Sequence, residues 1–126
     1  VQKGGVPIWL GLAPSERNIE RIAEFGDGWI PMEKNPGLLA GHIGRLRKAF
    51  VARGRDPQGL AVRVVLGAAL RADGTPDLEA TLAEVPALVA AGVTMVEVLP
   101  LVFCRGPQEF DAFCQRLVAV KREVAT

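Results

Sequence analysis

The sequence predicts an α/β protein built as the C-terminal half of a (β/α)8 TIM barrel, with four parallel β-α units. Short apolar runs alternate with segments of helical period four times along the chain. The runs are aliphatic on both faces, which is typical of parallel strands covered by helices. A complete barrel needs about 250 residues, and this chain has 126. A free-standing open sheet of four strands is the alternative architecture.

The first two units follow directly from period and capping. Residues 6–10 form an apolar run that predicts a strand. A helix follows, with Ser15 at its N-terminal cap and Gly26 at its end. Residues 28–30 predict a short second strand, and an apolar stripe predicts a long helix over residues 38–53.

The last two units are less regular. Residues 60–70 predict a long aliphatic strand, followed by a helical pattern over residues 78–89. Pro86 lies inside that pattern, so we expect a kink or a broken helix there. The fourth strand is expected over residues 95–102, and the last helix runs from Pro107 onward.

Composition bounds the organisation and the partners of the chain. No linker or low-complexity tract divides it, so residues 1–126 are expected to form a single partial domain. The net charge of +1 and the lack of a basic block give no electrostatic footprint for nucleic acid. No uncharged stretch is longer than 12 residues, the length of residues 85–96, and a membrane span needs about 20 residues. With two cysteines and no secretory leader, we expect a cytoplasmic protein.

The residue types that usually carry chemistry have ordinary structural interpretations here. His42 is the only histidine, so no metal cluster can form around it, and we expect a structural, surface or interface role. Cys104 and Cys114 have no histidine nearby in sequence and are expected to be inert thiols. The basic residues of one helix and the turn after it predict a solvated face: Arg45, Arg47, Lys48, Arg53 and Arg55. We therefore assign no catalytic residue and no metal ligand.

The loop over residues 11–15 is the one segment with a physical argument for ligand binding. It follows a predicted strand and opens a helix, so free backbone N–H groups and the Ser15 hydroxyl are available to a phosphate. An ordinary β-α loop with a capped helix is the alternative interpretation. In a parallel sheet this loop would lie at the same end as Pro31, Gly67 and Cys104, which follow the other strands.

Three motifs in the first half of the chain resemble the C-terminal half of luciferase-like monooxygenases. They are Pro7-Ile8-Trp9-Leu10-Gly11, Gly26-Asp27-Gly28-Trp29-Ile30-Pro31 and Gly54-Arg55-Asp56-Pro57. The branch with the greatest similarity uses the deazaflavin coenzyme F420 in place of FMN. The resemblance is specific over residues 7–57 and rests on the general pattern after that.

The resemblance implies an oxidoreductase or monooxygenase that binds F420 or FMN in the complete barrel and acts on a small organic substrate. Carried over to this chain, the cofactor-binding positions are Gly11, Leu12, Ala13 and Ser15. Leu12 departs from the second glycine of the family pattern and is expected to crowd the phosphate. The family's N-terminal half supplies the ring-binding surface and acid–base residues, so we expect this segment alone to be inactive and to bind no flavin tightly.

A different class of function remains open beside the enzyme. A sheet of four strands leaves two unpaired edges, and such edges invite pairing. The chain would then be a non-catalytic half-barrel, a binding or structural module that homodimerises. The expected macromolecular partner is therefore either a missing N-terminal half-barrel or a second copy of the chain.

Two charged residues stand in strands that are otherwise aliphatic. Arg63 lies between Val62 and Val64, and Glu97 lies in the fourth predicted strand. Since side chains alternate faces along a strand, both charges are expected on the face opposite the helices, pointing into the barrel. Neighbouring parallel strands bring them close together, so we predict an ion pair between Arg63 and Glu97. Exposure of each charge to solvent on an open side is the alternative.

Overall fold

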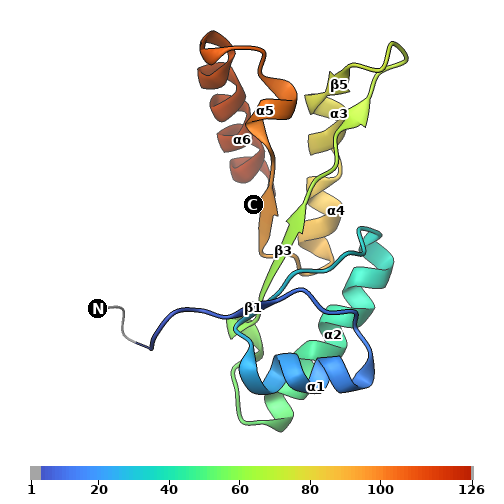
Figure 1. Ribbon diagram of the computed structural model, residues 1–126, viewed down its shortest axis with the longest axis vertical. Helices are drawn as coiled ribbons and strands as arrows, with labels where there is room; N and C mark the ends of the chain where they lie inside the picture. Colours follow the sequence, from blue (N-terminus) through green and yellow to red (C-terminus); the bar gives the residue numbers. More distant parts are fainter. Residues whose placement is uncertain (1–3, 126) are drawn as a thin grey trace.

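The computed structural model describes residues 4–125 and shows an α/β fold around a parallel sheet (Figure 1). The strand order is β1-β2-β3-β6, and every neighbouring pair is parallel. The strands are β1 (Trp9–Leu10), β2 (Gly28–Trp29), β3 (Ala61–Val65) and β6 (Met95–Glu97). The α/β class and the four-stranded parallel sheet are thus confirmed, and within residues 4–125 this sheet stays open rather than closing into a barrel.

The helices begin and end largely where their caps predict. They are α1 (Glu16–Phe25), α2 (Pro36–Ala52), α3 (Leu78–Leu82), α4 (Val85–Ala90), α5 (Pro100–Phe103) and α6 (Phe110–Val124), with 3-10 turns at Pro57–Gly59 and Pro107–Glu109. Ser15 caps α1 by accepting a hydrogen bond from the amide of Asn18. Asn35 caps α2, which has Pro36 in its first turn.

The expected strand over residues 60–70 is wrong beyond Val65. Instead, strand β4 (Ala69–Leu70) pairs antiparallel with strand β5 (Pro76–Asp77), and the two form a separate hairpin. The last register pair between β3 and β6 joins Val65 to Glu97, and the last hydrogen bond between them runs from the Leu66 amide to the Glu97 carbonyl, so the chain beyond Leu66 has no parallel neighbour. It therefore satisfies its backbone groups with the segment that follows.

The expected strand over residues 95–102 is also too long. β6 ends at Glu97, and α5 forms a single helical turn that starts at Pro100. Proline lacks a ladder N–H and has a backbone angle suited to the first turn of a helix, which explains the switch. The predicted break near Pro86 is confirmed, because α3 ends at Leu82 and Pro86 lies in the first turn of α4.

The core lies between the sheet and the helices on one of its faces. Trp29, Val62 and Val64 are fully buried there against the apolar faces of α1, α2 and α4. The packing of the aliphatic face of β3 on the helices is confirmed. The basic run is mostly at the surface, although Arg55 is half-buried and donates to the carbonyls of Ala23 and Gly26.

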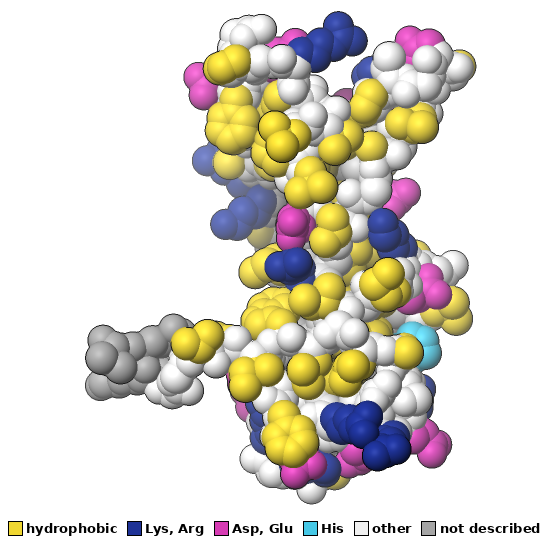
Figure 2. Space-filling model, viewed as in Figure 1, with side chains coloured by type: hydrophobic (Ala, Val, Ile, Leu, Met, Phe, Trp, Pro, Cys, Tyr) yellow, Lys and Arg dark blue, Asp and Glu magenta, His cyan; other side chains and the backbone are white. Residues whose placement is uncertain are grey.

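The opposite face of the sheet is much less covered, and we call it the open face. It carries Trp9, Arg63, Val65, Met95 and Glu97, all half-buried or exposed. A Cβ on Gly28 would lie 2.6 Å from the Trp9 ring, so glycine is required at that position. Figure 2 shows hydrophobic side chains gathered across the middle of the molecule. A face left open in this way is unusual, because parallel sheets are normally covered on both sides.

Candidate functional site

The carboxyl ends of the parallel strands bring three loops to one end of the sheet. The loop at residues 11–15 follows β1, while Pro31 and Gly67 lie two residues after the ends of β2 and β3. This arrangement was predicted, and it is the end of a parallel sheet at which ligands usually bind. Cys104 is one helical turn farther along than predicted, because α5 separates it from the end of β6.

Ser15 holds the loop against the start of α1. Its Oγ accepts the Asn18 amide at 3.3 Å, and the Asn18 side chain donates to the carbonyl of Ala13 at 3.0 Å. Ser15 therefore serves as an N-cap, as the capped-loop interpretation expects. Its hydroxyl proton is still available to an acceptor, as are the amide groups of Glu16 and Arg17, whereas the Asn18 amide is bonded to Ser15 itself.

Leu12 points away from the exposed side of the loop. Its side chain packs against the hydrophobic core, and its carbonyl accepts a hydrogen bond of 2.9 Å from the Trp29 indole. The side chain that was expected to crowd the loop therefore lies against the core. The backbone of the loop stays accessible despite the departure from a second glycine.

Gly11 is exposed, and the fold itself makes little demand for glycine at this position. A Cβ built on it would meet only the carbonyl oxygen of Ile30, at 3.8 Å, and its backbone is not in the left-handed region. Gly28, in contrast, is packed beneath an aromatic ring. The absence of a side chain at Gly11 leaves open space at the start of the loop that leads into α1.

Arg45 contributes to the loop, a role that the sequence did not indicate. Its guanidinium donates to the carbonyl of Pro14 at 3.2 Å, across 31 residues of sequence. Three residues earlier on α2, His42 packs edge-on against Trp29 with a ring separation of 6.2 Å. The spacing of His42 and Arg45 places both on one face of α2, and the sequence shows this much. What that face contacts is visible only in the packing of α2 beside α1.

The titratable groups at this end of the sheet do not form a convincing acid–base pair. Glu33 accepts the backbone amides of Asn35 and Lys34, and these hydrogen bonds lower the pKa of its carboxyl group. Burial raises the pKa of the Cys104 thiol, which favours its protonated form. Among the described residues, no group of three or more His, Cys, Asp or Glu side chains is arranged to bind a metal ion.

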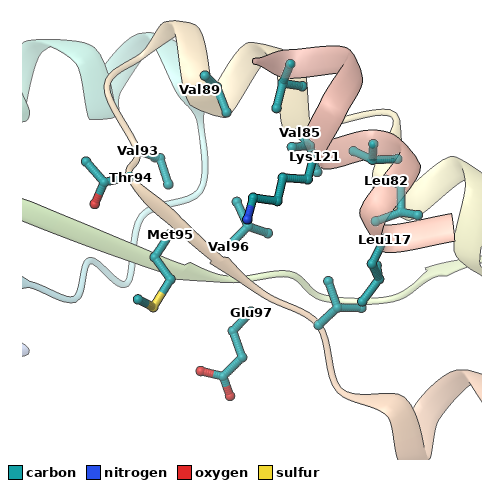
Figure 3. Close-up of a pocket in the computed structure, with 13 residues that line it drawn as sticks. Leu82, Val85, Val89, Val93, Thr94, Met95, Val96, Glu97, Leu117 and Lys121 are labelled. Atoms are coloured by element: carbon teal, nitrogen blue, oxygen red, sulfur yellow. The ribbon is translucent and has the colours of Figure 1, made fainter. Parts of the chain in front are cut away.

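A separate apolar cleft of about 630 Å³ lies beside β6, between α4 and α6 (Figure 3). It is lined mainly by valine and leucine side chains and is away from the loop at residues 11–15. We call it the β6 cleft. Across residues 4–125, no helix combines the length and the apolar character needed to cross a bilayer.

Comparison with known proteins adds no family assignment. No protein-family model matches the chain, and no curated protein sequence matches it. The resemblance to luciferase-like monooxygenases therefore depends on the three motifs in residues 7–57 alone.

Proposed function

We propose that this chain is the C-terminal portion of a luciferase-like oxidoreductase or monooxygenase that uses F420 or FMN on a small organic substrate. In this proposal the loop at residues 11–15 binds the phosphate arm of the cofactor. The ring-binding surface and the acid–base groups come from a second unit that covers the open face, and the segment alone is inactive. Its two free thiols suit a reducing compartment, so the proposed location is the cytoplasm.

The single observation that carries the proposal is the accessible backbone at Gly11. An exposed glycine with little structural demand begins the loop that leads into a helix N-terminus, at the ligand-binding end of a parallel sheet. This is the arrangement that lets a phosphate approach backbone N–H groups closely.

The chemistry of the residues fits a phosphate group. First-turn amides of α1 and the Ser15 hydroxyl are donors, and the partial positive charge of the helix end favours an anion. Arg45 braces the loop through Pro14 and adds positive charge behind it. The flavin or deazaflavin would supply the hydride chemistry when bound, whereas these residues bind and orient its phosphate.

The test is binding of FMN, with riboflavin as a ligand that lacks the phosphate. In ¹H–¹⁵N NMR spectra we expect weak FMN binding that shifts the amides of residues 11–17, and no such shifts with riboflavin. Gly11→Val should weaken FMN binding by at least about fivefold. Gly59→Val is the matched control, because Gly59 is also exposed with open space around it. Equal shifts with both ligands, or shifts confined to other residues, would refute the proposal.

A non-catalytic half-barrel module is the second candidate, and the open face favours it. Both candidates require a unit that covers this face. They differ in whether the loop binds a phosphate ligand, which the same NMR experiment measures.

A further inference from the structure

The two edges of the parallel sheet are unpaired. β1 and β6 are the outermost strands, and neither pairs with a further strand in the part of the chain that the structure describes. An unpaired edge presents a row of backbone donors and acceptors and is a template for another strand. The two edges differ in what surrounds them.

The edge at β6 is accompanied by an apolar groove. The β6 cleft includes Val96 and Val98 of this strand region, together with Val89 of α4 and Leu117 of α6. The Lys121 side chain extends into it from α6 (Figure 3). An extended apolar segment laid along β6 would fill this groove while pairing its backbone with the strand, which is a common mode of recognition.

The edge at β1 is preceded by a short apolar segment at residues 6–8, and two glycines with positive φ, Gly4 and Gly5, turn the chain ahead of it. Residues 4–8, which we call the arm, leave the body of the molecule next to β1 (Figure 1). Val6 is 82% exposed and Ile8 is 52% exposed. The backbone of Ile8 is held by hydrogen bonds with Asp27 and Gly28, so the arm starts from a fixed position.

The arm and the β6 cleft lie on opposite edges of one sheet, so the arm is not placed to fill the cleft of its own copy. We propose that a second copy of the chain is the partner. The arm and β1 of each copy lie parallel to β6 in the cleft of the other, around a two-fold axis that runs along the strands. Both contacts are then identical, and the assembly is closed at two copies.

This arrangement also brings the two open faces together. The charges on that face, Arg63 and Glu97, form an ion pair at 3.3 Å, so two copies meet without a net charge of one sign. Met95, 49% exposed in one copy, gains an apolar partner surface. The joined sheets contain eight strands, a number at which side chains fill the interior of a closed sheet. The inference rests on the second candidate function, the homodimerising half-barrel module, because a second copy then covers the open face in place of a separate ring-binding unit.

The first measurement is the mass of the chain by sedimentation equilibrium. We expect a reversible dimer with twice the 13.5 kDa of one chain. The arm variant carries Val6→Asp and Ile8→Asp, and the groove variant carries Val89→Asp, at a residue 38% exposed. Each should weaken the dimer by about 100-fold or more. Val51→Asp is the matched control, because Val51 is 59% exposed on α2 and should leave the dimer unchanged.

Mixing the two variants tests the pairing itself. The arm variant keeps an intact cleft and the groove variant keeps an intact arm, so a mixed dimer retains one good contact. We therefore expect the mixture to dimerise more tightly than either variant alone, with unchanged circular dichroism for each. A monomeric wild-type chain, a dimer insensitive to both variants, or no gain on mixing would overturn the inference. If a different polypeptide binds the β6 edge while the wild-type chain alone stays monomeric, the inference is also overturned.

Discussion

At the scale of single residues, the Arg63–Glu97 contact shows how much a strand pattern can predict. The two side chains pair at 3.3 Å on the open face, as alternation along the strands predicts. Each side chain is nevertheless 37% exposed, so the alternative, exposure of each charge to solvent, is also partly met. The Nε of Arg63 has almost no exposed surface and makes no hydrogen bond, which makes the contact a charge pair without a well-aligned donor.

This geometry predicts an unequal effect of single and double substitutions. Glu97→Ala should destabilise the protein by about 0.5–1 kcal/mol, because the buried Nε of Arg63 then has no negative charge next to it. Arg63→Met combined with Glu97→Leu should cost less, since no charge is left behind. The free energy of unfolding in urea measures both. If the double variant is the less stable of the two, the pair is not what stabilises this part of the sheet.

Residue roles that depend on local sequence were predictable, and those that depend on packing were not. Ser15 was identified as a cap because the cap and the Asn18 amide that donates to it lie within one helical turn. Arg45 was assigned to a solvated face, yet it contacts Pro14, which is far away in sequence. Leu12 was expected in the loop's binding surface, but the position of the core decides where its side chain points.

At the scale of elements, the existence of strands and helices was more predictable than their ends. Apolar period indicated all four parallel strands, but β1, β3 and β6 are each shorter than the apolar runs that predict them, and the expected first strand over residues 6–10 is reduced to Trp9–Leu10. The end of a strand depends on where its pairing partner ends, and the partner of β3 is β6, which is distant in sequence. The β4–β5 hairpin arises from the same cause and was missed.

Thr81 fixes this hairpin to the helix that follows it. It is 1% exposed, accepts the Ala69 amide at 2.9 Å and donates to the carbonyl of Asp77 at 2.6 Å. Thr81→Val should cost about 1–3 kcal/mol, because the half-buried Ala69 amide loses its acceptor. Thr81→Ser keeps the hydroxyl and is the control. Amide hydrogen exchange at Ala69 should accelerate in the valine variant only. Equal exchange in the two variants would show that β4 is held by other contacts.

At the scale of the whole molecule, one cluster of charges ties the C-terminal helix to the rest of the chain. Arg116 of α6 donates to both carboxylate oxygens of Glu79 on α3, at 2.8–3.0 Å, across 37 residues of sequence. It also contacts Glu123 within its own helix. The hydrogen bond from Arg116 lowers the pKa of the Glu79 carboxyl group.

The lowered pKa predicts the direction of an acid effect. A carboxyl whose pKa is lower in the folded state stabilises that state above its unfolded pKa, about 4.3 for glutamate. This stabilisation is lost as the pH falls through the lower folded value. The melting temperature of wild type should therefore exceed that of Arg116→Met at about pH 6, and the difference should shrink towards about pH 3. A difference that does not change over this range would rule out Glu79 as its source.

The hydrogen bond between the Trp29 indole and the Leu12 carbonyl couples the loop to the intrinsic fluorescence of the protein. Trp29 is completely buried, while Trp9, the other tryptophan, is half-buried on the open face. The emission of an indole depends on the polarity and hydrogen bonding around it. In a chain carrying Trp9→Phe, the fluorescence of Trp29 therefore reports any displacement of the loop backbone without an added label. Restoring Trp9 and replacing Trp29 moves the same signal to the open face, so one pair of native residues distinguishes events at the loop from events at the sheet.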